Sequence, residues 1–243
     1  MGYQPIEDYG IIGDMHTAAL ISKTGSIDWF CFPHFDSPSV FAAMLDDKKG
    51  GHFTIEPLDG NVTFKQMYWP GTNILITRFL SDAGVAEIVD YMPVDKSLDL
   101  HKHRHQLVRS ITVVRGSFRF RMECRPAFDY ARQTHNIEVN DNNVTFSSDD
   151  LTLSLLTTCQ LEARDNAAYA EFSLEEGDSS VFILRRAERG QDDFDIRNMH
   201  QQLFKATLDY WHRWLARCTY TGRWREMVRR SALALKLLTF EPT

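Results

Sequence analysis

The sequence predicts a mainly β protein, an antiparallel sandwich followed by two C-terminal α-helices. Three observations support this prediction. Segments with apolar residues at every second position recur through residues 1–190, which is typical of half-buried strands. Short runs of Gly, Asn, Asp and Ser separate these segments. From about residue 191 the apolar spacing changes to three and four, the period of an amphipathic helix.

The first expected elements lie in residues 10–39, which predict a β-hairpin that runs into an aromatic loop punctuated by proline. Residues 37–45 are expected to form a short helix, with Ser37 as its N-cap and Pro38 at its first position. A turn at Arg115-Gly116-Ser117 is expected to separate two strands. The segments expected to be strands are residues 61–68, 73–79, 85–90, 107–114, 117–124, 151–157, 169–174 and 179–185.

Two helices are expected to follow. The first starts near Asp192, where carboxylates favour the helix dipole, and Thr221-Gly222 ends it. The second covers about residues 224–239, and its last part, residues 231–238, is apolar on nearly every side. Such a helix needs burial all round. We therefore expect this chain to be a fragment whose natural partner surface lies elsewhere; packing on the sandwich or in a dimer is the alternative.

Composition and charge exclude several classes of protein. The 243 residues include 27 Lys and Arg against 33 Asp and Glu, a net charge of −6, which does not favour nucleic-acid binding. No signal peptide and no apolar run of membrane-spanning length are present, so we expect no membrane association. The four cysteines form no C-x-x-C pair, which favours free thiols in a reducing, cytoplasmic compartment and no metal.

Several motifs, in order along nearly the whole chain, carry a family resemblance. They are residues 10–39, Val89-Asp90-Tyr91-Met92-Pro93, Leu107-Val108-Arg109 with Arg115-Gly116, Arg125-Pro126-Ala127-Phe128-Asp129-Tyr130-Ala131-Arg132, and Trp224-Arg225-Glu226 leading into residues 231–236. The chain resembles the N-terminal, trehalase-like or glucoamylase-like domain of bacterial glycoside hydrolase family 15 proteins. The resemblance implies a β-supersandwich over residues 1–190, a linker helix over 191–222, and over 223–243 the start of a truncated α/α-toroid catalytic barrel.

The family hydrolyses α-glucosidic bonds with inversion, using two glutamates that both lie in the barrel. No residue of this chain matches either glutamate, so the resemblance implies no catalytic residue here and no cofactor. It implies a non-catalytic domain that supports the barrel and edges its active site. The expected partners are the barrel itself, which is missing from this chain, and the α-glucoside substrate of the parent enzyme.

The best candidates for sugar contact lie in the aromatic loop. Trp29 and Phe35 offer flat apolar faces on which a sugar stacks, and His34 and Asp36 offer hydrogen bonds to hydroxyl groups. The alternative is structural: the aromatic side chains belong to the core, and Asp36 or Ser37 caps the short helix.

Other polar and apolar residues are candidates for an interdomain contact. Arg125, Asp129, Tyr130 and Arg132 form a dense polar cluster after a strand, which is either an interdomain contact or a structural corner. Trp224 and Leu235 of the second helix are expected to contact the barrel. His101, His103 and His105 alternate in a way that can bind zinc, but Lys102 and Arg104 favour a solvated loop.

Two other functions remain open at this stage. The chain is alternatively a stand-alone carbohydrate-binding module, which requires exposed, coplanar aromatic side chains away from the helices. It is alternatively an assembly domain that forms a homodimer through its exposed apolar C-terminal helix.

Overall fold

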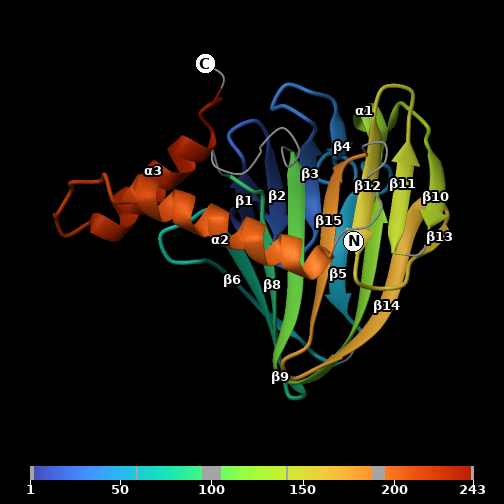
Figure 1. Cartoon of the computed structure of the whole chain (residues 1–243), viewed down its shortest axis with the longest axis horizontal. Helices are drawn as coiled ribbons and strands as arrows, with labels where there is room; N and C mark the ends of the chain where they lie inside the picture. Colours follow the sequence, from blue (N-terminus) through green and yellow to red (C-terminus); the bar gives the residue numbers. More distant parts are fainter. Residues whose placement is uncertain (1–2, 59, 95–104, 141, 188–194, 242–243) are drawn as a thin grey trace.

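The computed structural model describes residues 3–58, 60–94, 105–140, 142–187 and 195–241. In this part of the chain fifteen strands form two layers, and two long helices lie at one side of them (Figure 1). A short 3-10 helix, Ile6–Asp8, precedes the first strand. The mainly antiparallel β fold with C-terminal helices is confirmed, and none of the described helices is long and apolar enough to cross a membrane.

The first sheet starts with the expected hairpin, in which Gly13 of one strand is opposite Ala18 of the next. From this edge the strand order is β1, β2, β3, β5 and then β9, a long strand that both sheets share. The sheet contains β1 (Tyr9–Gly13), β2 (Ala18–Ser22), β3 (Ile27–Cys31), β4 (Ser39–Phe41), β5 (His52–Pro57), β13 (Glu162–Arg164), β14 (Ala167–Glu175) and the second half of β9 (Gln106–Arg125).

The second sheet consists of meandering antiparallel strands on both sides of the first half of β9. It contains β6 (Thr63–Tyr68), β7 (Leu75–Ser81), β8 (Gly84–Tyr91), β10 (Asn136–Asn140), β11 (Asn143–Ser147), β12 (Thr152–Thr157) and β15 (Ser179–Arg186).

Strand β9 belongs to both layers, and this corrects the expected turn at residues 115–117. Its first half pairs with β8 and β15, and its second half pairs with β5 and β14. Gly116 has φ of +79° and is opposite Gly84, next to a shift in register between Val85 and Ala86. Gly116 therefore lies at an irregularity inside one strand and not in a turn. Because glycine has no Cβ, it lets the strand pass from one layer to the other there.

The core lies between the two layers and is rich in phenylalanine. Phe53 of the first sheet contacts Phe182 of the second at a ring distance of 6.4 Å, and Phe79 contacts Phe120 at 6.2 Å. A buried ion pair also joins the layers. Arg109 Nε donates to Asp90 at 2.8 Å, and its guanidinium also donates to the carbonyls of Phe53 and Gly25. Both charged side chains are completely buried.

Helix α2 (Ile196–Leu215) crosses the outer face of the second sheet (Figure 1). It starts at Asp195, whose carboxylate accepts from the amide of Asn198 at 3.1 Å, so the helix begins three residues after the expected Asp192. Residues spaced four apart form its buried face: Leu203, Thr207, Trp211 and Leu215.

Helix α3 (Arg225–Leu237) is attached to the sandwich along one side only. Leu233 and Leu237 are buried, whereas Leu235 is 69% exposed and Leu238 is 52% exposed. Polar contacts add to the attachment: Arg230 donates to the carbonyl of Thr72 at 2.7 Å, and Asn73 donates to the carbonyl of Leu233 at 3.0 Å. The alternative that this helix packs on the sandwich is thus met on one face, while the opposite apolar face is open.

The expected helix over residues 37–45 differs from the structure. Residues 39–41 are strand β4, not part of a helix, because Ser39 and Phe41 pair with Cys31 and Phe30 of β3. The tertiary pairing overrides the local Ser-Pro start signal. The turn α1 (Phe128–Ala131) follows β9, and three consecutive residues have positive φ there, Asp129 (50°), Tyr130 (56°) and Ala131 (62°).

Candidate functional site

The candidate site lies where α3 ends against the β1–β2 turn. Asp14 shapes this turn, because its Oδ1 accepts from the amides of His16 and Thr17, both at 2.9 Å. Gly13 lets α3 approach closely, since a Cβ there would lie 2.8 Å from a methyl carbon of Leu237. After α3 the chain turns back, and the amide of Glu241 donates to the carbonyl of Met15 at 3.0 Å (Figure 1).

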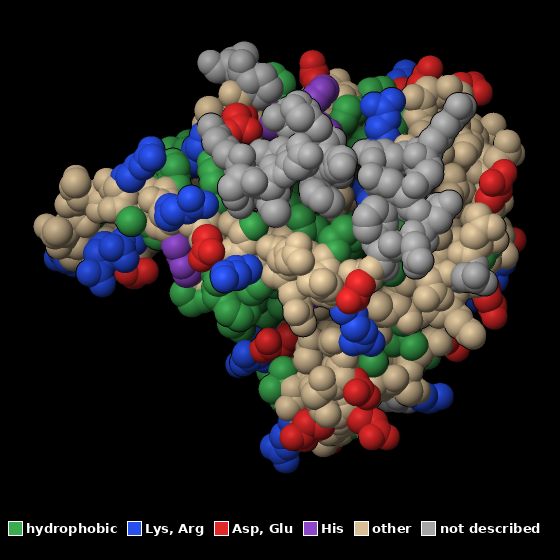
Figure 2. All heavy atoms as spheres, viewed as in Figure 1, with side chains coloured by type: hydrophobic (Ala, Val, Ile, Leu, Met, Phe, Trp, Pro, Cys, Tyr) green, Lys and Arg blue, Asp and Glu red, His purple; other side chains and the backbone are tan. Residues whose placement is uncertain are grey.

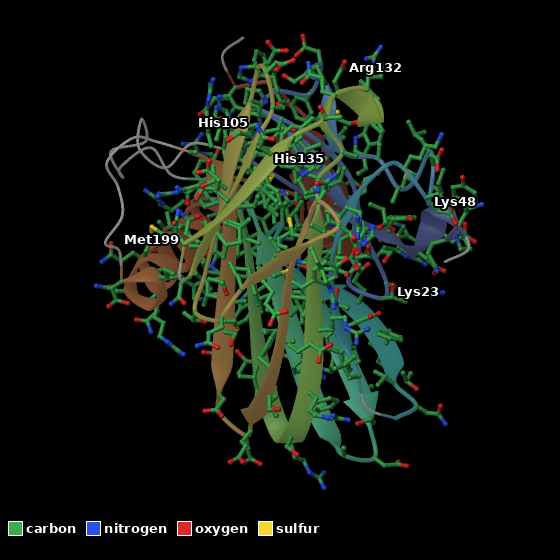
Figure 3. All side chains as sticks on the ribbon, turned by 90° about the vertical axis from the view of Figure 1, so that its right-hand side faces the viewer. Lys23, Lys48, His105, Arg132, His135 and Met199 are labelled. Atoms are coloured by element: carbon green, nitrogen blue, oxygen red, sulfur yellow. The ribbon has the colours of Figure 1, made fainter. Side chains whose placement is uncertain are left out.

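Three histidines from distant parts of the sequence meet at this place. The ring of His16 lies 5.2 Å from that of His105 and 6.2 Å from that of His34, and His34 lies 5.4 Å from His105. Phe240 lies against two of them, with centroid distances of 5.8 Å to His16 and 5.9 Å to His34. We call Asp14, His16, His34, His105 and Phe240 the histidine cluster. Figure 3 places His105 at the same end of the molecule as Arg132.

The loop that carries His34 is held to the turn by backbone contacts. The amide of Phe35 donates to the carbonyl of His16 at 2.8 Å, and the amide of His34 donates to Ser37 Oγ at 3.1 Å. His16 is nearly buried, and its Nδ1 donates to the carbonyl of Asp14 at 3.1 Å. These contacts therefore hold the loop against the turn.

Electrostatics at His34 favour a neutral imidazole. Burial lowers the pKa of His34, and the neighbouring His105 and His16 lower it further. Asp36 and Asp14 oppose this lowering, but the net pKa stays below the usual value. Asp14 Oδ2 lies 3.5 Å from His105 Nδ1. Neutral imidazole both donates and accepts hydrogen bonds, so His34 can bind a hydroxyl group.

No metal site arises in the part of the chain that is described: no group of three or more His, Cys, Asp or Glu there could hold an ion. His101 and His103 lie outside the described residues, so the alternating triad is not tested as a whole. His105 itself contacts His16, His34 and Phe32, and so lies among aromatic side chains and not in the solvated loop expected from its charged neighbours.

The four residues expected to contact sugar do not all come together. His34 joins the histidine cluster, and the amide of Phe35 contacts the His16 turn. Asp36 is exposed beside His34. Trp29 instead lies at 6.3 Å from Tyr130, with the two ring planes tilted by 52°.

The residues expected at an interdomain contact fall into three separate groups. Arg125 donates to Glu123, Tyr169 and the carbonyl of Asp165, a network within the first sheet. Asp129 and Arg132 form an ion pair at 2.7 Å near α1. Trp224 and Leu235 are more than half exposed on and next to α3.

Sequence reasoning missed Asp14, His16 and Phe240 as site residues. Part of the site was within reach, because the β1–β2 turn and the loop after β3 lie at the same end of an antiparallel sheet. That relation places His16 near His34. His105 and Phe240 are brought in by β9 and α3, whose positions depend on long-range packing.

The fold and the site together define a class: a two-layer antiparallel β domain that carries a polar loop surface and two helices at one side. Residues 2–210 match a known family described as "Trehalase-like, N-terminal". This chain therefore belongs to the family of trehalase-like N-terminal domains.

Curated relatives agree with this assignment. A trehalase of Thermoplasma acidophilum is 33% identical over 228 residues, which are 92% of this chain and 38% of the relative. A trehalase of Thermoplasma volcanium is 30% identical over all of this chain and 39% of its own length. A trehalase of Mycobacterium tuberculosis is 30% identical over 99% of this chain and 38% of its own. The chain thus spans about two fifths of the length of these relatives.

Proposed function

We propose that this chain is the non-catalytic N-terminal domain of a glycosidase that acts on α-glucosidic bonds, with trehalose as the favoured substrate. The observation that carries the proposal is the family match over residues 2–210, together with relatives named trehalase. The parent enzyme is of the glycoside hydrolase family 15 type, inverting, and located in the cytoplasm.

In this proposal the open face of α3 is covered by the catalytic part of the parent enzyme. Trp224, Met227, Leu235 and Leu238 each expose more than half of their surface, and together they are an apolar surface of the kind that marks an interaction site. Lys and Arg side chains gather over α2 and α3 (Figure 2). Residues 195–241 contain nine Lys or Arg and four Asp or Glu, whereas the rest of the chain contains 18 Lys or Arg and 29 Asp or Glu. The helical region is therefore basic and the rest of the chain acidic.

We test the proposal by assaying glucose release from trehalose and from maltose. The 243-residue chain is compared with the whole polypeptide that its gene encodes. We expect the chain alone to be inactive and the whole polypeptide to hydrolyse trehalose. Glucose release by the purified chain, a gene that stops after Thr243, or a longer polypeptide without activity on either sugar would each contradict the proposal.

The finer part of the proposal is that the loop with His34 and Asp36 borders the sugar site. In the whole enzyme we expect His34→Ala and Asp36→Ala to lower kcat/KM by about tenfold, the effect of one lost hydrogen bond to substrate. The thermal midpoint serves as the control for folding. Unchanged kinetics with unchanged stability would remove this loop from the site.

The dimer alternative makes a separate prediction. If α3 joins two copies of this chain, light scattering should give twice the monomer mass, and Leu235→Glu should return it to the monomer. A monomer at every concentration would remove the alternative.

A further inference from the structure

The loop that carries His34 also borders a pocket on the other side, between β4, α1 and the β11–β12 turn. The pocket has a volume of about 180 Å³. At about 30 Å³ for each water in the liquid, this is room for roughly six waters, and so for one small ring and not for a chain of rings. We call it the α1 pocket. Nothing in the proposed function uses it.

One side of the α1 pocket is apolar. Phe32, Val40 and Phe128 lie behind its surface, and each is at most 3% exposed. Pro33, Pro38 and Leu151 complete this side. Apolar side chains of this kind dominate the lining of small-molecule sites and accept the C–H groups of a ring.

The remaining lining is polar and mixed in charge. Asp150 accepts from the side-chain amide of Gln133 at 2.9 Å. The other polar residues that line the pocket are Ser37, Ser148, Asp129 and Arg186. Carboxylates only accept hydrogen bonds, guanidinium only donates, and hydroxyl and amide groups do both. A ligand that satisfies such a set must both donate and accept at several points, as a polyhydroxylated molecule does.

A buried hydroxyl in the pocket has no partner among the described residues. Ser39 is 1% exposed, it lines the pocket, and its Oγ makes no hydrogen bond there. A buried polar group without a partner is unfavourable, so this hydroxyl is an unsatisfied polar group in the pocket wall.

The backbone beside the pocket is also strained. Asp129, Tyr130 and Ala131 all have positive φ, a conformation that only glycine adopts freely, and none of the three is glycine. Each left-handed residue without a local compensation is unfavourable, and such strain gathers at ligand sites. The strained turn holds Asp129 and Phe128 at the pocket wall.

The lining disfavours two other ligand classes. A small anion would meet two carboxylates, Asp129 and Asp150, against one guanidinium, that of Arg186. A metal ion would need three suitable ligands, and the described residues offer no such group. We propose that the α1 pocket binds one pyranose ring, or a neutral polyol of the same size, without catalysis.

The test uses this chain, so its result is independent of whether the proposed function is right. D-glucose is titrated into the ¹⁵N-labelled chain, and backbone amide shifts are followed by NMR. A single ring bound in a small open pocket should have a Kd on the order of 1–10 mM. We expect the shifts to change at residues 37–40, 128–133 and 148–151 and to saturate.

The matched pair of variants is Asp150→Asn and Asp149→Asn. Both remove one carboxylate beside the same turn, but only Asp150 lines the pocket. We expect Asp150→Asn to weaken glucose binding about tenfold, since it removes a charged acceptor, and Asp149→Asn to leave it unchanged.

Three results would overturn the proposal. They are no saturable shift with glucose up to about 100 mM, shifts at other surfaces only, and an equal loss of binding in the two variants. Inorganic phosphate is titrated in parallel, and saturable phosphate binding at the pocket without glucose binding would also overturn it.

Discussion

The β-sandwich and the helical C-terminal region differ in how completely they are closed. In the sandwich even a buried charge is matched, because Arg109 bonds to Asp90, to the carbonyl of Phe53 in the opposite sheet and to that of Gly25 in its β2–β3 turn. In the helical region α2 is anchored by Trp211, but α3 leaves Leu235 and Leu238 open. The difference teaches that the sandwich is specified by contacts within the chain, whereas α3 is specified only on the face that meets the sandwich.

The largest effect is expected in the sandwich, when its buried ion pair is broken. Arg109→Leu leaves the Asp90 carboxylate buried without its partner, and burial already raises the pKa of Asp90. We expect a loss of about 3–5 kcal/mol in the free energy of unfolding, measured with urea. The control is Arg121→Leu, whose partner Glu171 is 56% exposed, and it should cost less than about 1 kcal/mol. Equal losses would show that burial does not decide the strength of these pairs.

The next effect concerns the strand that joins the two layers. Gly116→Ala should destabilise by about 3 kcal/mol, because its φ is +79° and the new Cβ would meet the carbonyl oxygen of Ala83 at 2.0 Å. Gly177→Ala is the matched control, with φ of +88° but no atom within 4 Å of the new Cβ. It should cost only about 1–2 kcal/mol, the strain of the left-handed conformation. A smaller loss at Gly116 than at Gly177 would contradict the close approach.

A third pair sharpens the comparison within α3 itself. Leu237→Ala should destabilise the attachment of α3 by about 2–3 kcal/mol, because the side chain is fully buried against Gly13. Leu235→Ala, on the open face, should change it by less than about 0.5 kcal/mol. Hydrogen exchange of the α3 amides measures both. Similar protection in the two variants would mean that the helix is not held by one face.

The smallest expected effect is the pH response of the histidine cluster. Since the pKa of His34 is lowered in the folded state, the folded protein resists its protonation. Its contribution to stability is therefore complete above the unfolded pKa of about 6.5 and is lost as the pH falls below it. We expect His34→Gln to reduce the loss of stability between pH 7 and pH 5 by less than about 1 kcal/mol, since His34 is only partly buried.

Urea midpoints at the two pH values measure this effect. The control is His212→Gln, a substitution at an exposed position of α2. The prediction fails if His34→Gln increases the acid sensitivity. His135 and His200 also have lowered pKa values because of burial, so part of the response should remain in the variant.

Much of the fold followed from the sequence because strand and helix periods are local signals. The alternation in residues 61–90 predicted β6, β7 and β8, and the spacing of three and four predicted α2 and α3. Where the prediction was wrong, a distant pairing decided the local structure. A glycine such as Gly116 is compatible both with a turn and with an irregularity inside a strand. Only the pairing with β8 shows that it lies inside a strand.

The candidate site was less predictable than the fold. His34 was among the candidate residues, but its neighbours His105 and Phe240 are far away from it in the sequence. The α1 pocket combines β4, α1, the β11–β12 turn and the end of β15, so no local pattern contains it. Local periods can predict elements, whereas sites between elements require the packing that brings them together.

The strand shared by both layers also has a consequence for biosynthesis. The partners β5 and β8 of β9 precede it in the chain, whereas β14 and β15 follow it. While the ribosome adds residues 126–186, one edge of β9 has no partner strand, for roughly 3–12 seconds at elongation rates of about 5–20 residues per second. An unpaired edge of a long strand invites association with other nascent chains. Chaperone binding to this region should therefore be strongest before residue 186 has left the exit tunnel.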